Sequence, residues 1–205
     1  MTKSIPILLI GAGGHCKSCI DLISTISDYQ VGGIVDKDGS KCIEVLGQKV
    51  IGTDSDLKFL VQRFPQLLIA VGQIESPLLR SELFLKTKNL GASFPVIISP
   101  TAYISNTAII DEGTISFHQT LINTSVKVGK NCIINNKALI EHESTIGSHC
   151  HVSTGALING GVVIDEGCFI GSGAIIHEGV KIGRGSVISA GKIVRKDIPN
   201  NTILR

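Results

Sequence analysis

The sequence predicts two consecutive folds: an α/β N-terminal Rossmann-like unit with a parallel sheet, then an all-β left-handed parallel β-helix of hexapeptide repeats. Two observations carry this prediction. In the second half, a branched aliphatic residue recurs at every sixth position, and in the first half apolar strand segments alternate with helical segments. We expect a Rossmann-like domain over residues 1–95 and a β-helix domain over residues 96–205.

The six-residue period excludes ordinary helices and half-buried strands, whose side chains repeat every 3.6 and every 2 residues. The repeat runs from Ile104 to Val194 with one exception, Ser116. Small side chains stand two residues before most of these aliphatics, and Gly, Asn, Asp and Glu are frequent in between. Each hexapeptide therefore supplies one short strand and one corner, and three hexapeptides make one coil. Stacked coils bury a single aliphatic column.

The first half contains a strand at 5–10, a glycine-rich turn at 11–14, a helix at 15–24 and a second strand at 31–35. A strand at 50–51, a helix near 55–63, a strand at 67–71 and a helix at 76–89 follow. Strands that alternate with helices form parallel sheets, which bind ligands at the carboxyl ends of the strands. The turn, Asp36 and Gly72 all fall at such ends.

The charge balance excludes some classes of partner. Nineteen basic residues stand against seventeen acidic ones, so neither a nucleic acid nor an anionic membrane is expected as the main partner. The apolar runs are far shorter than a membrane span. The glycine-rich turn follows the first strand where a signal peptide would need an apolar core. We therefore expect a cytoplasmic protein that binds small molecules.

The cysteines are consistent with that compartment. Cys132, Cys150 and Cys168 are spaced by eighteen residues, which predicts an inward ladder of free thiols along one face of the solenoid. Cys16 and Cys19 have the spacing of a redox or zinc motif, but no second ligand pair follows them. Because Cys19 falls among the apolar positions of the predicted helix, we interpret this pair as packing residues.

The glycine-rich turn is a candidate anion site. A turn between a strand and a helix can place backbone N–H groups against a phosphate. Gly11 and Gly13 lack the third glycine of a dinucleotide fingerprint, which argues against a redox nicotinamide site. A nucleotide-diphosphate site and a merely tight turn remain open. The neighbouring His15 could contact a phosphate or cap the helix.

One hexapeptide, residues 138–143, carries a candidate general base. Its His142 lies at a corner beyond Ile140, so the core does not need it. An adjacent carboxylate can orient an imidazole and stabilise its protonated form. Glu141 and Glu143 both qualify by proximity, and the alternative is a solvated histidine at a corner.

The repeats, the turn at 11–15 and the stretch from Asn135 to Gly155 resemble the PglD/NeuD family of bacterial sugar acetyltransferases. The resemblance covers essentially the whole chain in order, and its central His-Glu motif is specific. It implies acetyl transfer from acetyl-CoA to an amino or hydroxyl group of a surface-glycan sugar. It also implies homotrimers with active sites between subunits.

Carried over by position, the resemblance implies that His142 is the base and Glu143 its partner, without a metal. The implied acetyl-CoA contacts are His151, Gly160, Ser172 and Ala190, and the implied acceptor contacts are Gly13, Gly14, His15, Asp36, Gly72 and Asn135. No Cys or Ser stands beside His142 as an acyl carrier, so we expect direct attack within a ternary complex.

The main functional prediction is N-acetylation of an amino group on a nucleotide-linked, UDP-type deoxyamino sugar for bacterial surface glycan synthesis. The N-terminal unit motivates it, because such a unit suits a nucleotide-diphosphate handle. O-acetylation of sialic acid or a related nonulosonic acid is the alternative within the family, and a non-catalytic sugar-nucleotide binding protein is an alternative outside it. A metal-dependent hydratase resembling γ-class carbonic anhydrase is disfavoured because His142, His151 and His177 are not separated by multiples of eighteen.

Overall fold

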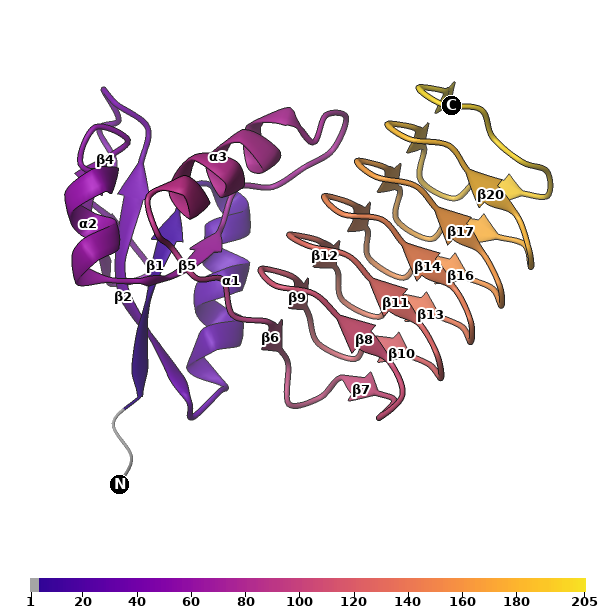
Figure 1. Cartoon of the computed structure of the whole chain (residues 1–205), viewed down its shortest axis with the longest axis horizontal. Helices are drawn as coiled ribbons and strands as arrows, with labels where there is room; N and C mark the ends of the chain where they lie inside the picture. Colours follow the sequence, from indigo (N-terminus) through magenta and orange to yellow (C-terminus); the bar gives the residue numbers. More distant parts are fainter. Residues whose placement is uncertain (1–3) are drawn as a thin grey trace. The chain divides into compact units, whose positions relative to one another are not determined.

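The computed structural model describes residues 4–205, and its contacts divide the chain into two units (Figure 1). The first comprises the chain up to Gly72 together with Leu79–Pro95, and the second comprises Gln73–Leu78 together with Val96–Arg205. The segment Gln73–Leu78 thus groups with the repeats although it lies well before them in the sequence. The domain boundary at residue 95 stays a prediction.

The first unit is a five-stranded sheet with three helices. Its elements are β1 (Ile5–Ile10), α1 (Gly14–Ser24), β2 (Tyr29–Asp36), β3 (Glu44–Val45), β4 (Gln48–Thr53), α2 (Leu57–Arg63), β5 (Gln66–Ile69) and α3 (Leu78–Asn89). The strand order is β3-β4-β2-β1-β5. All neighbouring strands are parallel except the antiparallel pair β3 and β4, which confirms the predicted parallel sheet.

The central strand and the first helix of this unit are buried as their sequences predict. The last four residues of β1 are fully buried, as expected of a strand covered on both faces. Helix α1 buries Cys16 and Cys19 on the same face as Ile20 and Ile23. Burial raises the pKa of the Cys16 thiol to about 11 and that of Cys19 to about 12. Both side chains therefore pack as neutral groups, as predicted.

Two local features differ from the sequence prediction. The hairpin of β3 and β4 was not predicted, because its turn is Leu46-Gly47, with φ of 47° and 77°, rather than a typical Asn-Gly pair. Helix α3 begins at Leu78, two residues later than expected. There the Ser76 hydroxyl accepts a hydrogen bond from the Leu78 N–H at 3.3 Å, and Pro77 stands between them.

The second unit is a parallel β-helix of two-residue strands. They are β6 (Ile97–Ile98), β7 (Tyr103–Ile104), β8 (Ile109–Ile110), β9 (Ile115–Ser116), β10 (Leu121–Ile122), β11 (Lys127–Val128), β12 (Ile133–Ile134), β13 (Leu139–Ile140), β14 (Thr145–Ile146), β15 (His151–Val152), β16 (Leu157–Ile158), β17 (Val163–Ile164), β18 (Phe169–Ile170), β19 (Ile175–Ile176), β20 (Lys181–Ile182), β21 (Val187–Ile188), β22 (Ile193–Val194) and β23 (Ile203–Leu204).

These strands form three parallel sheets, the faces of the solenoid (Figure 1). We name them by one member each. The β13 sheet has the order β22-β19-β16-β13-β10-β7, the β14 sheet β20-β17-β14-β11-β8, and the β15 sheet β23-β21-β18-β15-β12-β9-β6. Residues eighteen apart are register partners, as Leu139 and Leu157 show.

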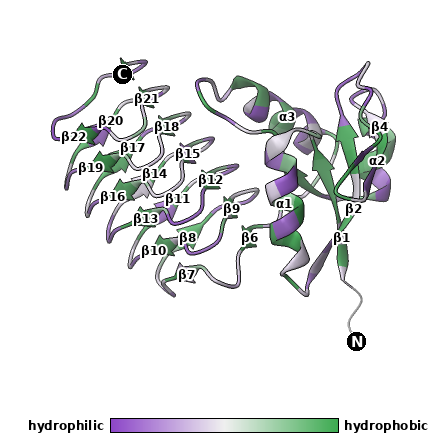
Figure 2. Cartoon of the chain, turned by 180° about the vertical axis from the view of Figure 1, so that it is seen from behind, coloured by the Kyte–Doolittle hydropathy of each residue, from purple (hydrophilic) through white to green (hydrophobic). Residues whose placement is uncertain are grey.

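The predicted aliphatic column is the core of this unit. Its members are buried from Ile122 to Val194, and the strands appear as apolar segments between polar turns in Figure 2. The exception in the repeat, Ser116, is fully buried and lies 2.6 Å from the Thr120 hydroxyl, so its polar atom is satisfied. The thiols of Cys132, Cys150 and Cys168 are free and buried in the column, as predicted.

No helix within residues 4–205 has the length and hydrophobicity to cross a membrane.

Ile164→Ala tests the column. Ile164 is 1 % exposed on β17, and removing its side chain leaves a cavity between stacked coils. We expect the free energy of unfolding to fall by about 2–5 kcal/mol, measured from urea midpoints at an unchanged denaturant slope. Lys181→Ala, at an exposed position on the next strand of the same sheet, should change it by less than about 0.5 kcal/mol. Equal losses in both variants would contradict a buried column.

Candidate active site

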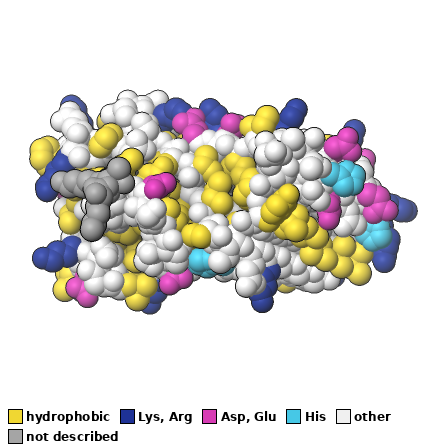
Figure 3. Space-filling view, turned by 90° about the horizontal axis from the view of Figure 1, so that it is seen from below, with side chains coloured by type: hydrophobic (Ala, Val, Ile, Leu, Met, Phe, Trp, Pro, Cys, Tyr) yellow, Lys and Arg dark blue, Asp and Glu magenta, His cyan; other side chains and the backbone are white. Residues whose placement is uncertain are grey.

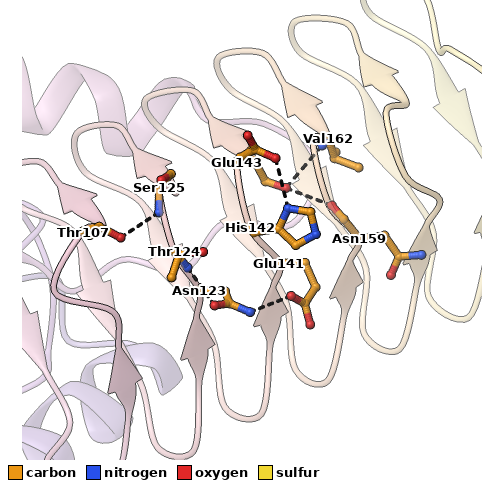
Figure 4. Close-up of polar contacts among 10 residues, drawn as sticks. Thr107, Asn123, Thr124, Ser125, Glu141, His142, Glu143, Asn159 and Val162 are labelled. Atoms are coloured by element: carbon orange, nitrogen blue, oxygen red, sulfur yellow. Dashed lines mark hydrogen bonds and ion pairs between the residues drawn. The ribbon is translucent and has the colours of Figure 1, made fainter.

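His142 lies at the corner between β13 and β14, where the β13 and β14 sheets meet (Figure 4). The preceding Ile140 is fully buried in the column, so the strand fixes the backbone from which the imidazole projects. The His142 side chain is 57 % exposed. The structure confirms the predicted corner position, and the imidazole is accessible to a ligand.

A carboxylate orients this imidazole. His142 Nδ1 lies 3.2 Å from Glu143 Oε2 (Figure 4). An ionised carboxylate only accepts hydrogen bonds, so Nδ1 donates, and in the neutral ring Nε2 keeps its lone pair. Glu141 is engaged elsewhere, since its Oε2 accepts a 2.7 Å hydrogen bond from Asn123 Nδ2. Of the two predicted partners, Glu143 is the one that contacts His142.

The next residue anchors the corner to the following coil. The Ser144 hydroxyl donates to the Asn159 carbonyl at 2.8 Å and accepts from the Val162 N–H at 3.2 Å. Ser144 is fully buried, so these bonds are shielded from water. The backbone carrying His142 and Glu143 is therefore held rigidly on one side by the column and on the other by Ser144.

Glu143 adopts a left-handed backbone conformation, with φ of 60°. From Gly155 onward, the corresponding turn positions up to Gly191 are all glycine, with φ between 64° and 74°. A Cβ atom in this conformation costs about 1–2 kcal/mol. The chain thus keeps a side chain at a strained position, and that side chain is the carboxylate that contacts His142.

A second polar cluster surrounds His151 on the β15 sheet. His151 Nδ1 lies 2.6 Å from the backbone carbonyl of Gln73, and a carbonyl only accepts, so Nδ1 carries the proton. Asn135 Nδ2 then donates to His151 Nε2 at 3.2 Å. The ring is 8 % exposed and contacts the Phe169 ring edge to face at 5.2 Å between centroids. These contacts hold His151 in one neutral tautomer.

Sequence reasoning missed Gln73, which supports this second cluster. Its side-chain Nε2 also donates to the His149 carbonyl at 3.0 Å, and the residue is 3 % exposed. The only sequence signal was its place directly after Gly72, at the end of a strand. Because Gln73 lies nearly eighty residues before His151, no local pattern could have paired them.

The predicted residues Ser172 and Ala190 lie at a different corner from His142. Both are exposed, and both stand between the β15 sheet and the β13 sheet, one coil apart. The Ser172 hydroxyl lies 2.9 Å from that of Ser153. Gly160 lies one coil beyond His142 at the His142 corner. Within one chain, these candidate residues therefore flank opposite edges of the β13 sheet.

The structure brings the five predicted acceptor residues of the first unit to one edge of its sheet. Gly13 and Gly14 open helix α1, with no atom within 4 Å of the position that a Cβ would occupy. Asp36, at the end of β2, accepts hydrogen bonds from the Ala12 N–H and the Ser40 hydroxyl. A Cβ at Gly72 would lie 3.5 Å from the His15 Cβ.

Two further carboxylates follow β2 and β4 near this edge. The hydroxyls of Thr53 and Ser55 lower the pKa of Asp38. Burial raises the pKa of Asp54. Opposite shifts at neighbouring carboxylates show that one is solvated and hydrogen-bonded while the other is partly desolvated. In the part of the chain that the structure describes, no three His, Cys, Asp or Glu side chains are grouped so that they could hold a metal ion.

Comparison with known proteins follows the same division of the chain. Residues 6–84 match the PglD N-terminal domain family, and residues 161–196 match the bacterial transferase hexapeptide (six repeats) family. PerB from Caulobacter crescentus, solved with CoA and GDP-perosamine, is 30 % identical over 99 % of this chain and 94 % of its own, with a TM-score of 0.89. The chain belongs to the PglD/NeuD-like family of sugar acetyltransferases.

Other solved structures agree with this membership. The acetyltransferase domain of PglB from Neisseria gonorrhoeae FA1090 is 29 % identical over 97 % of this chain and 95 % of its own, with a TM-score of 0.89. WeeI from Acinetobacter baumannii AYE, 24 % identical over 98 % and 96 %, shares the fold with a TM-score of 0.83. The curated proteins gave no match. The predicted fold class, a Rossmann-like unit followed by a left-handed β-helix, is confirmed.

The strained backbone of Glu143 gives a prediction for this family member. Glu143→Gly and Glu143→Ala remove the same carboxylate, but only alanine keeps a Cβ at φ of 60°. We expect the glycine variant to be the more stable of the two by about 1 kcal/mol in urea unfolding. At Glu141, whose φ is negative, the same pair of variants should show the opposite order. A more stable alanine at position 143 would refute the strain.

Proposed function

We propose that the protein transfers the acetyl group of acetyl-CoA to an amino group of a nucleotide-linked deoxyamino sugar for bacterial surface glycan synthesis. The observation that carries the proposal is the pair of His142 and Glu143, whose 3.2 Å contact leaves Nε2 as an exposed basic nitrogen. The likeness to PerB, solved with CoA and GDP-perosamine, supports it. Acetyl-CoA and sugar nucleotides are cytoplasmic metabolites, so the proposed compartment is the cytoplasm.

His142 is the proposed general base. Acetyl-CoA supplies an activated acetyl thioester, and the acceptor supplies the nucleophilic amine. His142 Nε2 takes the proton that the attacking nitrogen loses, and Glu143 stabilises the resulting imidazolium through Nδ1–H. The chain holds no acyl carrier beside His142, and the sugar amine attacks directly. O-acetylation of a nonulosonic acid would use the same base on a hydroxyl group.

The corner of Ser172 and Ala190 fits an extended ligand. Both side chains are small and exposed, and they stand one above the other on successive coils. An extended thiol arm can follow such a corner along the solenoid axis. His151, Gly160, Ser172 and Ala190 remain the proposed acetyl-CoA contacts, and Asn135 remains a proposed acceptor contact.

A trimer would bring the two corners together. The β13 sheet carries outward aliphatic side chains, and Figure 3 shows hydrophobic side chains gathered on the surface beside histidine and acidic ones. The outward residues are Leu121, Leu139, Leu157, Ile175 and Ile193. If this sheet faces a three-fold axis, the His142 corner of each chain adjoins the Ser172 corner of the next. Active sites between subunits follow from that arrangement.

The edge of Gly13, Gly14, His15, Asp36 and Gly72 is the proposed acceptor site. The open space at the two turn glycines and the N–H groups that begin α1 suit a diphosphate. The proposed nucleotide is of the UDP type. Because PerB is solved with a GDP sugar, both nucleotides belong in the substrate panel.

His142→Ala tests the base. General base catalysis contributes roughly 10²- to 10⁴-fold, so kcat should fall by that factor in an assay of CoA release with UDP and GDP amino sugars. Glu143→Ala should cost less, because water partly replaces the carboxylate, and the double variant should resemble His142→Ala. Sialic acids in the same panel test O-acetylation. Turnover of sialic acids alone would replace the proposed acceptor.

The control for this experiment is the assembly. The corner position of His142 predicts that His142→Ala keeps the thermal midpoint and the trimer mass of the parent by light scattering. A folded variant with kcat within tenfold of the parent would remove His142 from the mechanism. A monomeric parent would remove the proposed intersubunit site.

Gly14→Val tests the acceptor site. Valine fits the fold because no atom lies within 4 Å of the Cβ position, but its side chain would occupy the proposed path of the phosphates. We expect the Kd of the acceptor to rise at least about tenfold by calorimetry, with the Kd of acetyl-CoA unchanged. Ser24→Val, at the exposed far end of α1, is the matched control. Unchanged acceptor binding by Gly14→Val would place the diphosphate elsewhere.

A further inference from the structure

The His142 ring rests on a residue without a side chain. Gly160 lies one coil beyond His142, and a Cβ placed on it would be 2.7 Å from His142 Cε1, 2.8 Å from Nε2 and 3.3 Å from Nδ1. These three ring atoms are the nearest neighbours of that position. Heavy atoms do not approach a Cβ so closely. The imidazole therefore occupies the space that any other residue at position 160 would fill.

The backbone does not require glycine at this position. Gly160 is absent from the glycines with positive φ, whereas its neighbour Gly161 has φ of 66°. Other glycines with ordinary φ serve the coil stack itself, as at Gly147, where a Cβ would meet the Glu166 backbone nitrogen at 2.5 Å. The equivalent corners one coil on either side of His142 and Gly160 carry side chains, Thr124 and Glu178. Glycine at 160 is explained by the imidazole alone.

We propose that Gly160 is a positioning residue, which seats the imidazole of His142 with Nε2 uncovered. The inference rests on the proposed function and adds to it a steric determinant of the base. The Glu143 carboxylate fixes the ring at Nδ1, and the bare Cα of Gly160 supports its Cε1–Nε2 edge. Two contacts on different edges define the ring orientation. A methyl group at 160 would displace the edge that bears the reacting nitrogen.

Gly160→Ala is the direct test. The obstruction is a side-chain end that can rotate away, so the fold should accept alanine while the ring moves. Misplacement of a catalytic group by about 1 Å can cost about 10²-fold, and we expect kcat to fall by roughly that factor. The thermal midpoint should stay equal or rise, because alanine at a compatible φ lowers the entropy of the unfolded chain.

A double-mutant cycle separates this role from a contact to acetyl-CoA. In the His142→Ala background the space beside Gly160 is empty, so Gly160→Ala should cause no further loss of kcat and no loss of thermal stability. If Gly160 serves only as an acetyl-CoA contact, the same loss appears in both backgrounds together with a weaker Kd for acetyl-CoA. Such a result would overturn the positioning role.

Gly179→Ala is the matched control. Gly179 occupies a corner of the next coil with φ of 69°, and no atom lies within 4 Å of its Cβ position. Alanine there should lower the thermal midpoint and leave kcat within about threefold. A loss of kcat as large as that of Gly160→Ala would show that any disturbance of the corners inactivates the protein, and would overturn the specific seat.

The imidazole can also be observed without any assay. We expect the ring resonances of His142, assigned by their absence in His142→Ala, to shift in Gly160→Ala and not in Gly179→Ala. If the parent transfers no acetyl group, the proposed function fails while these spectra still decide the seat. Unshifted resonances together with parental kcat in Gly160→Ala would overturn the inference.

Discussion

The burial of one aliphatic side chain in every six residues is the constraint on which the rest of the β-helix depends. Each strand is only two residues long, too short to be stable by itself, and gains its stability from the strands above and below it. The column that these side chains form fixes the register at eighteen residues. Residues at corners then stack without taking part in the core. Chemistry at a corner can change while the column stays intact.

The corners show how this freedom is used. Late coils place glycine at the left-handed turn position, which is the least strained choice. The coil of Glu143 departs from that choice, and the following coil departs again at Gly160, where a side chain would be tolerated by the backbone. Both departures face His142. Local rules of turn chemistry fail where one imidazole has to be held.

The sequence predicted what repeats and missed what does not. The column, the thiol ladder and the corner position of His142 follow from a period, and a period can be read from one chain. The choice of Glu143 over Glu141 depends on Asn123, one coil earlier, which takes Glu141 as its own partner. The support of His151 by Gln73 joins distant segments. The β3–β4 hairpin lacked a typical turn, and its short strands gave no alternation.

The stacking of coils also makes the β-helix a ruler. Successive coils are separated by the spacing of hydrogen-bonded strands, about 4.8 Å, whatever side chains they carry. The separation along the axis between the coil of His142 and that of Ala190 is therefore set by counting coils. Inserting or deleting one whole coil between them would preserve the column and its register. It would change the length of ligand that spans the two sites by one fixed increment, so the fold measures its donor in discrete steps.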